Sequence, residues 1–429
     1  MKRQWSTNLS FILAAAGSAI GIGNIWKFPK AAYEGGGGAY LLVYVLIAFI
    51  MGTAILIAEF ALGRGMGRTM IGAFLGQWKW VGYLGVFTAF LVLCYYYQAG
   101  GWILRYFVGY IADGARMLNE PQRVYFELMG SGGFPLLGGL IYPAAYIFLN
   151  VAVVKKGLIQ GAERLSRIAM PLLFALLIAL LIRALTMEGA CAGVDFLMKI
   201  DFSRLGFSGL LNALGQAFFS LSIGMSVMVT YGAFLNKSEP LIKNAAWVCA
   251  LDTGSALIAA FIVIPAVFAS GNLPSGGGSF AFVEIAEVFN AMRFGSLFGL
   301  MFYALLFLAA FVSSVSILEG ILCCLEERWK VKRGLAGLIV SLAALAIGVF
   351  YTADYDSGGM GAKLEVVTDR YLMPAVTFLT CAYLVFVYRM KRLSAELNCN
   401  RGFFAVWRFT ITVIAPIVIL LILVCSFVF

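Results

Sequence analysis

Residues 17–29 read GSAIGIGNIWKFP, which places small and polar residues inside an otherwise apolar stretch. Gly17, Gly21 and Gly23 stand before an asparagine and a lysine. If a helix unwinds here at mid-membrane, its backbone N–H and C=O groups must find other partners. The N-terminus of a half-helix attracts an anion, and freed carbonyl oxygens attract a cation. The stretch therefore predicts a site for a zwitterion that is bound together with a small hard cation.

A second stretch, FSLSIGMS at residues 219–226, interrupts another apolar run with serine and glycine. Gly17 and Gly21 alone are explained equally well by close helix packing, because small residues four positions apart let two helices approach. Two interrupted spans in corresponding positions, one opening each half of the chain, are instead typical of the binding site of a membrane carrier. The pair of interruptions therefore favours a transport site.

Long apolar helices are the elements that must position these residues. The chain has 429 residues, of which 62% are hydrophobic and 12% charged, whereas about a quarter of the residues in an average soluble domain are charged. Apolar runs of about 20 residues, the length that crosses a bilayer, recur throughout. We expect an all-α polytopic membrane protein with eleven spans, near residues 8–30, 39–65, 82–110, 136–154, 166–187, 208–235, 241–270, 296–325, 334–351, 370–390 and 403–428.

The spans are expected to form a single transmembrane domain over residues 1–429. The corresponding positions of the two interrupted spans predict that residues 8–187 and 208–390 are two inverted repeats and that residues 403–428 form an extra helix. Most of the 31 Lys and Arg residues fall in segments on the same side as the N-terminus, which the positive-inside rule places in the cytoplasm. The net charge of +10 then reflects orientation and attraction to anionic lipid rather than nucleic acid. We expect a multi-pass protein of the cell's inner (plasma) membrane.

Missing residue types exclude most enzyme classes. The chain contains no histidine, which removes Ser-His hydrolases, HExxH zinc proteases and histidine proton relays. Its eight cysteines show no CxxC spacing and lie mostly within apolar runs, as is typical of buried thiols. No GxSxG motif is present. We therefore expect no enzymatic activity.

Several motifs together resemble the neurotransmitter:sodium symporter family. They are GSAIGIGNIWKFPKAAYEGGGGAY, IAEFALGRG, YYYQAGGW, AERLSRIAMP, GQAFFSLSIGMS and AAFVSSVSILEG, in this order along the chain. The resemblance implies a LeuT-like fold with two inverted five-helix repeats. It also implies symport of an amino acid with sodium across the lipid bilayer by alternating access.

The resemblance implies two sodium sites. The first would use the Ala19 carbonyl, Asn24, Ser220, Asp252 and the substrate's own carboxylate. The second would use the carbonyls of Gly17, Ile20 and Ala309 together with Ser313. Val312 stands where the family usually has an oxygen-bearing side chain, so the number of sodium ions, one or two, remains open. Asp252 either replaces an asparagine or lies near the acidic residue that replaces chloride in bacterial members, and in both alignments its charge predicts that chloride is not required.

For the substrate, the resemblance implies a pocket with a polar and an apolar end. Ser18, Gly21 and Gly23 would surround the carboxylate, with Tyr96 as its hydroxyl partner. Phe219, Ser222, Met225, Val92, Ser313 and Ile317 would line the side-chain pocket. Packing alone would also explain the apolar members, but their character predicts a neutral hydrophobic amino acid, aliphatic or aromatic, because an unpaired polar side chain would lose hydrogen bonds there.

Charged residues are expected to form gates on both sides. The resemblance implies an outer gate between Lys27 and Asp369, and an inner gate that involves Lys2 or Arg3, Trp5 and Glu327. Lysine lacks the bidentate fork of arginine, the usual outer residue, so the outer closure should be looser.

Glu59 lies deep in the second span, where a carboxylate is costly and therefore functional or paired. The resemblance implies that it hydrogen-bonds the broken backbone near the first and sixth spans.

Other functions remain possible for the same sequence. A carrier of this fold could be driven by protons, with Asp252 or Glu59 titrating. A receptor or channel would bind or conduct without concentrating a substrate. Uptake against a gradient distinguishes these possibilities from sodium symport.

Overall fold

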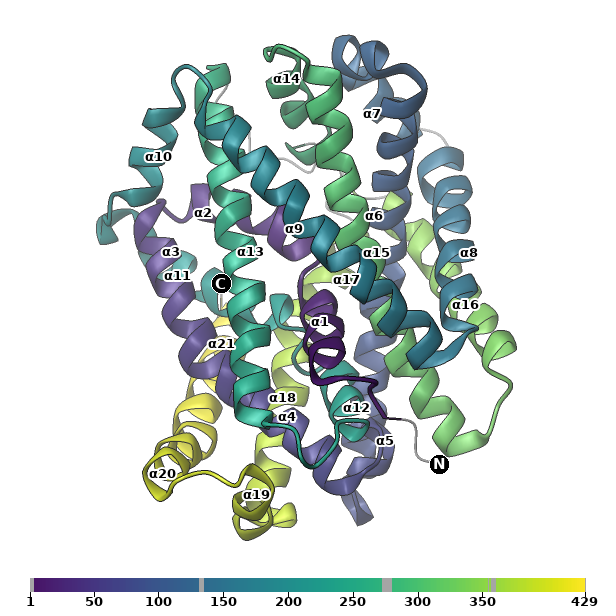
Figure 1. The fold of residues 1–429 in the computed structure, drawn as a ribbon, viewed down its shortest axis with the longest axis vertical. Helices are drawn as coiled ribbons and strands as arrows, with labels where there is room; N and C mark the ends of the chain where they lie inside the picture. The colour runs from purple at the N-terminus through teal and green to yellow at the C-terminus, as the bar shows by residue number, and fades with distance from the viewer. Residues whose placement is uncertain (1–3, 131–134, 272–279, 354, 356–359, 429) are drawn as a thin grey trace.

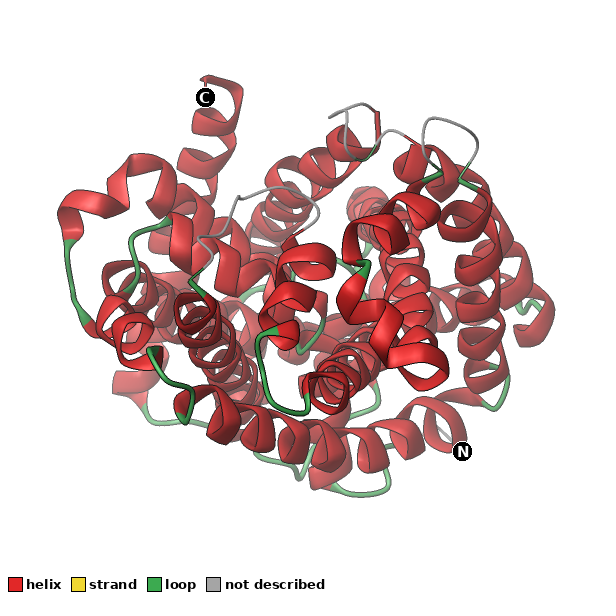
Figure 2. Cartoon of the chain, turned by 90° about the horizontal axis from the view of Figure 1, so that it is seen from above, coloured by secondary structure: helices red, strands yellow, loops and turns green. Residues whose placement is uncertain are grey.

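The computed structural model describes residues 4–130, 135–271, 280–353, 355 and 360–428. Helices dominate this part of the chain, which contains no strand (Figure 2). Segments labelled η are π-helical, except for η3, which is a 3-10 helix, and several of them continue directly into α-helices. The expected all-α membrane fold is therefore confirmed.

The first half of the chain contains the elements up to the end of α10. They are α1 (Asn8–Ala19), η1 (Gly23–Lys27), α2 (Phe28–Glu34), α3 (Gly38–Ile47), η2 (Ala48–Gly52), α4 (Thr53–Met66), α5 (Met70–Ala73), η3 (Gly76–Trp78), α6 (Lys79–Asn119), α7 (Pro121–Met129), η4 (Leu136–Ile141), α8 (Tyr142–Val154), η5 (Leu158–Glu163), α9 (Arg164–Leu185) and α10 (Ala190–Met198).

The second half begins with another interrupted helix. Its elements are α11 (Phe202–Ser220), α12 (Val227–Ala233), α13 (Leu241–Ser270), η6 (Phe280–Glu284), α14 (Ile285–Asn290), α15 (Gly295–Trp329), α16 (Arg333–Ala353), α17 (Met360–Val366), η7 (Val367–Leu372), α18 (Met373–Tyr383), η8 (Leu384–Tyr388), α19 (Met390–Leu397), α20 (Arg401–Phe409), η9 (Thr410–Ile414) and α21 (Ala415–Val428).

Both predicted interruptions are present. α1 ends at Ala19, Ile20 adopts an extended conformation with ψ 103°, and the chain resumes as η1. The two parts, Asn8–Ala19 and Gly23–Glu34, meet at an angle of 54°. α11 ends at Ser220, and α12 begins only at Val227. Ser222, Gly224 and Ser226 between them have φ values of 53°, 75° and 72°, a left-handed conformation that non-glycine residues adopt only under strain.

The predicted number of spans is not confirmed. Within the described residues, nine helices are long and apolar enough to cross a membrane, or ten if the bent pair of α1 and η1–α2 counts as one span. The remaining predicted span, 208–235, is divided between α11 and α12. α12 is only seven residues long, whereas α11 has 19 residues but includes polar ones such as Arg204, Asn212 and Gln216. Neither part is recognised as a span by length and composition together, so the count of eleven stays a prediction.

The interrupted helices lie inside the bundle. α1 packs against α9, α13 and α15, while α12 packs against α4 and α15. In Figure 1, α1 lies near the middle of the molecule, surrounded by longer helices. α5, α19 and α20 lie at one end of the bundle, and α7, α10 and α14 lie at the other. The breaks in α1 and α11 are thus enclosed by continuous helices that hold them in place.

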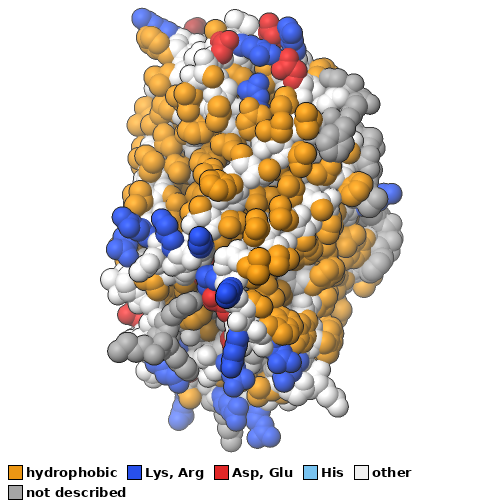
Figure 3. Space-filling model, turned by 90° about the vertical axis from the view of Figure 1, so that its right-hand side faces the viewer, with side chains coloured by type: hydrophobic (Ala, Val, Ile, Leu, Met, Phe, Trp, Pro, Cys, Tyr) orange, Lys and Arg blue, Asp and Glu red, His pale blue; other side chains and the backbone are white. Residues whose placement is uncertain are grey.

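The outer surface fits a lipid environment. Hydrophobic side chains dominate the upper and middle parts of the face in Figure 3, and Lys and Arg side chains gather toward its lower end and its top edge. Large apolar side chains such as Phe148, Ile182 and Phe350 are more than half exposed. A soluble protein rarely exposes apolar surface on this scale.

Candidate functional site

A cavity lies where the two interruptions meet. Its lining consists of Ser18, Ala19, Gly21, Gly23, Val92, Tyr96, Phe219, Ser222, Met225, Ser313 and Ile317. The structure therefore brings together all ten residues expected to bind the substrate, and adds Ala19, which was expected at the first cation site. These side chains come from both breaks and from α6 and α15.

The glycines of the first break allow close approach. The Ile22 N–H donates to the Tyr96 hydroxyl at 3.1 Å. A Cβ atom added to Gly21 would collide with that hydroxyl, and one added to Gly23 would lie 2.9 Å from the Phe219 ring. Glycine is therefore required at both positions because side chains from α6 and α11 press against the backbone.

Two serine hydroxyls join the breaks to α15. Ser222 Oγ donates to the Ser18 carbonyl at 3.0 Å, and Ser313 Oγ donates to the same oxygen at 2.9 Å. A carbonyl left free by the end of α1 thus finds partners from α15 and the second break, as buried backbone groups must. The Ser18 hydroxyl itself is buried and has no hydrogen-bond partner within the described residues.

A polar cluster lies beside this cavity. Asn24 Nδ2 donates to Asp252 Oδ1 at 2.7 Å and to Ser220 Oγ at 3.1 Å. Ser220 Oγ lies 2.9 Å from each carboxylate oxygen of Asp252. The three side chains are almost completely buried. Oxygen atoms of this kind suit a hard cation.

The hydrogen bonds around Asp252 indicate which contacts a bound cation would replace. Asn24 turns its NH2 group toward Asp252 and uses its oxygen to accept from the Gly21 N–H at 3.0 Å. The Asp252 carboxylate is therefore stabilised by neutral hydrogen-bond donors here. A cation bound beside Asp252 would take over this role, and Asn24 would have to present its oxygen instead.

The residues implied for a second cation site fit less well. A Cβ atom on Gly17 would lie 2.6 Å from a methyl carbon of Val312, so this methyl group packs directly against the backbone of α1. Ser313 already donates its hydroxyl to Ser18. The set of Gly17, Ile20, Ala309 and Ser313 therefore lacks a side-chain oxygen at position 312, where an apolar group stands.

Glu59 supports the second break from α4. Its Oε1 accepts from the Gly224 N–H at 2.9 Å, which confirms the expected bond to unwound backbone near the sixth span. Oε2 is buried without a hydrogen-bond partner in the described structure. Gly224 has a positive φ and no space for a Cβ atom, so the carboxyl group fixes a segment that cannot form helical hydrogen bonds.

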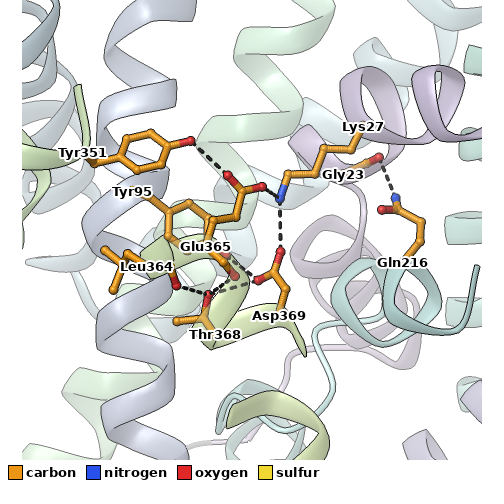
Figure 4. A network of polar contacts seen from close by, with 9 residues as sticks. All are labelled: Gly23, Lys27, Tyr95, Gln216, Tyr351, Leu364, Glu365, Thr368 and Asp369. Carbon is orange, nitrogen blue, oxygen red and sulfur yellow. Dashed lines mark hydrogen bonds and ion pairs between the residues drawn. The ribbon is translucent and has the colours of Figure 1, made fainter. Parts of the chain in front are cut away.

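The expected outer pair forms above the cavity (Figure 4). Lys27 Nζ lies 3.2 Å from Asp369 Oδ2. Lys27 also pairs with Glu365, which the sequence reasoning missed. Glu365 precedes Asp369 by four residues, a helical spacing that places both on one face, and this signal could have revealed it.

Other polar residues around the outer pair were also missed. Tyr95 and Tyr351 donate hydroxyl hydrogen bonds to Asp369 and Glu365, at 2.9 Å and 3.1 Å. Gln216 Nε2 donates to the Gly23 carbonyl at 2.9 Å (Figure 4). Their types alone gave no signal, because tyrosine and glutamine within apolar helices have many roles.

The residues expected at the inner gate lie only partly within the described structure. Trp5 Nε1 donates to the Tyr231 carbonyl at 3.1 Å, and the ring is buried. Glu327 accepts from the Thr69 N–H at 2.8 Å. Lys2 and Arg3 lie outside the described residues. The N-terminal segment is further held by Ser6, which hydrogen-bonds the buried Glu163, another residue missed from the sequence.

Comparisons with known proteins cover nearly the whole chain. Residues 2–114 and 126–429 match the sequence model of the sodium:neurotransmitter symporter family. A Bacillus subtilis protein named as an uncharacterized sodium-dependent transporter is 34% identical, over 98% of this chain and 96% of its own. A similarly named protein of Methanocaldococcus jannaschii is 30% identical, over 97% and 89%. The crystal structure of MhsT in complex with L-phenylalanine superposes with a TM-score of 0.91 at 32% identity, over 99% of this chain and 100% of that chain.

Proposed function

Because this chain belongs to the sodium:neurotransmitter symporter family, we propose that it is a symporter that imports a neutral hydrophobic amino acid with sodium by alternating access. At the coarser level it is a sodium-dependent membrane transporter with a LeuT-like fold, and not an enzyme. The observation that supports the finer proposal is the cavity at the meeting point of the two interruptions. The chemistry of its lining suits a zwitterion with an apolar side chain, because both unwound backbone and apolar side chains face it.

The two ends of the cavity suggest how an amino acid lies in it. The carboxylate would face the backbone of Gly21 and Gly23 and the Tyr96 hydroxyl. Val92, Phe219, Met225 and Ile317 provide apolar surface for a side chain. Methionine adapts its shape readily, and the neighbouring structure MhsT was determined with L-phenylalanine. These facts favour an aliphatic or aromatic substrate.

A single sodium ion at the first site is the coupling we favour. Asn24, Ser220 and Asp252 offer oxygen atoms and a negative charge, whereas the Val312 methyl group weakens the second set. The fixed charge of Asp252 also supports transport without chloride. Two sodium ions remain the alternative that the family resemblance implies.

Gates on both sides would make access alternate. The pair of Lys27 and Asp369 would close the outer side, and Trp5 and Glu327, with Lys2, would close the inner side. We place the N-terminus in the cytoplasm and the protein in the plasma membrane, because the positive-inside rule supports that orientation.

Uptake into proteoliposomes tests the proposal. Radiolabelled neutral amino acids are screened with an inward sodium gradient, and at least one hydrophobic amino acid should accumulate above its external concentration. Replacing sodium with choline should abolish accumulation. Accumulation in choline that follows a proton gradient would instead indicate a proton-coupled carrier. Sodium-dependent binding without accumulation would indicate a receptor.

A further inference from the structure

The outer gate contains a second carboxylate with its own partner. Lys27 lies in η1, Glu365 in α17 and Asp369 in η7. The Lys27 ammonium contacts both carboxylates, and Glu365 is the closer of the two. Figure 4 shows the ammonium pointing between them. The closed gate is therefore a triad with one positive and two negative charges.

The two carboxylates have different surroundings. Asp369 Oδ1 accepts from the Tyr95 hydroxyl at 2.9 Å and from Thr368 Oγ1 at 3.1 Å, which leaves Oδ2 for Lys27. Glu365 accepts from the Tyr351 hydroxyl of α16 at 3.1 Å through one oxygen and contacts Lys27 through the other. Each carboxylate is thus fixed by its own tyrosine, and both have one oxygen directed at the same ammonium.

Lys27 also lies over an aromatic ring that lines the cavity. Its Nζ is 4.1 Å from the centroid of the Phe219 ring, and Phe219 lines the cavity below. An ammonium has three N–H donors that point in different directions. Two carboxylates and one aromatic face satisfy all three, since a cation over a ring is attracted to its face. A planar guanidinium could not address these three partners in the same way.

The geometry points to Glu365 as a positioning residue that holds Lys27 over Phe219 and so determines how firmly the outer side closes. Asp369 alone would hold the ammonium from one side, whereas Glu365 and Asp369 together fix it above the ring. The inference rests on the proposed alternating-access function, but its test needs no substrate.

Thiol labelling of the cavity measures outer closure directly. Val92→Cys in α6 places a thiol in the cavity wall, with the exposed Cys191 removed as Cys191→Ser. A small membrane-impermeant thiol reagent is added from outside, and mass spectrometry identifies the modified cysteine. Rates are compared in sodium or potassium medium, whichever labels the parent protein more slowly. This readout stays valid even if no amino acid is transported.

Loss of Glu365 should open the outer side. Glu365→Gln should speed labelling of the thiol introduced at position 92 about threefold to fivefold, as for one partly exposed ion pair, because the side chains of Lys27 and Glu365 are 26% and 27% exposed. Lys27→Met should have a similar effect, and the double variant should label no faster than Lys27→Met. Lys27→Arg should also label faster than the parent. Glu34→Gln, which removes the same charge from the Lys30 pair nearby, is the matched control and should leave the rate unchanged.

Two outcomes would overturn the inference. One is unchanged labelling in Glu365→Gln together with faster labelling in Asp369→Asn, which would make Asp369 the sole partner. The other is a multiplicative effect in the double variant, which would mean that Glu365 acts independently of Lys27. If Glu365→Gln does not fold, Glu365→Asp keeps the charge on a shorter side chain and should label at an intermediate rate.

Discussion

At the scale of single residues, close contacts explain why the first break contains glycine. Gly21 meets the Tyr96 hydroxyl and Gly23 meets the Phe219 ring, so each position tolerates only a hydrogen atom. By contrast, a Cβ atom added to Gly215 in α11 would meet nothing within 4 Å. The chain thus offers glycines that the site requires and glycines that it does not.

Gly21→Ala should therefore abolish sodium-dependent uptake, with a loss of about a hundredfold or more, because the new methyl group displaces Tyr96 and closes the cavity. Gly215→Ala is the matched control and should transport like the parent protein. Adding Tyr96→Phe, which removes the colliding hydroxyl, should restore part of the substrate binding. Radiolabelled uptake and binding measure all three variants, and normal uptake in Gly21→Ala would contradict the geometry.

Asp252→Asn removes the only carboxylate of the polar cluster formed by Asn24, Ser220 and Asp252. The half-saturating sodium concentration should rise about tenfold or more, since a unit charge a few ångströms from a cation contributes several kcal/mol even at a high effective dielectric constant. The amide still accepts hydrogen bonds, so folding should be retained. Sodium titration of substrate binding measures the change, and an unchanged titration would exclude Asp252 from the cation site.

Val312→Thr tests the second set of residues. The added hydroxyl replaces one methyl group of nearly the same volume and supplies the oxygen that the sequence lacks at this position. The Hill slope of sodium-dependent binding should be near one in the parent and rise in the variant. Val312→Ala removes both methyl groups of the side chain without adding oxygen and should leave the slope near one. A slope well above one in the parent would contradict coupling to a single ion.

At the scale of elements, the two interrupted helices are held by continuous neighbours. α15 reaches the end of α1 through Ser313, α6 reaches it through Tyr96, and α4 holds the second break through Glu59. These hydrogen bonds replace the helical ones that the unwound backbone has lost. The continuous helices therefore determine where the interruptions stay open.

Two variants separate the role of Glu59 as a hydrogen-bond acceptor from the role of its negative charge. Glu59→Gln keeps an oxygen that can accept from the Gly224 N–H, so we expect uptake within a few-fold of the parent. Glu59→Ala removes the acceptor and leaves a buried N–H unpaired, at a cost of about 1–3 kcal/mol, so uptake and thermal stability should both fall. If Glu59→Gln is as inactive as Glu59→Ala, a proton or charge at this position takes part in transport.

At the scale of the whole molecule, orientation can be measured with native cysteines. Cys191 in α10 is exposed, and Cys399 lies partly buried between α19 and α20 at the opposite end of the bundle. In intact cells, an impermeant thiol reagent should modify Cys191 from outside and reach Cys399 only after the membrane is opened. The reverse pattern would place the N-terminus outside. Cys191→Ser and Cys399→Ser identify each signal.

Much of this site could be predicted from the sequence, because local residue types dictate local backbone. Glycines and serines inside apolar runs predicted both breaks, and the family motifs placed all ten cavity residues on one site before any fold was known. The charge balance between segments predicted an orientation. Even the hydrogen bond that Glu59 accepts from broken backbone followed from the family resemblance and the cost of a carboxylate within a membrane.

Only the tertiary structure decided the contacts between residues that are far apart in the sequence. Glu365 became a partner of Lys27 because α17 lies over η1. Its four-residue spacing from Asp369 placed both carboxylates on one helix face but did not show which residue that face meets. A Val312 methyl group packs on Gly17 because α15 crosses α1 at this point. The position that lacks a ligand oxygen is therefore occupied by an apolar group. Fewer than eleven spans are recognisable among the described residues because α12 is short and α11 contains several polar residues. Backbone conformation follows from nearby residues, whereas contacts between helices are set by the packing of the whole bundle.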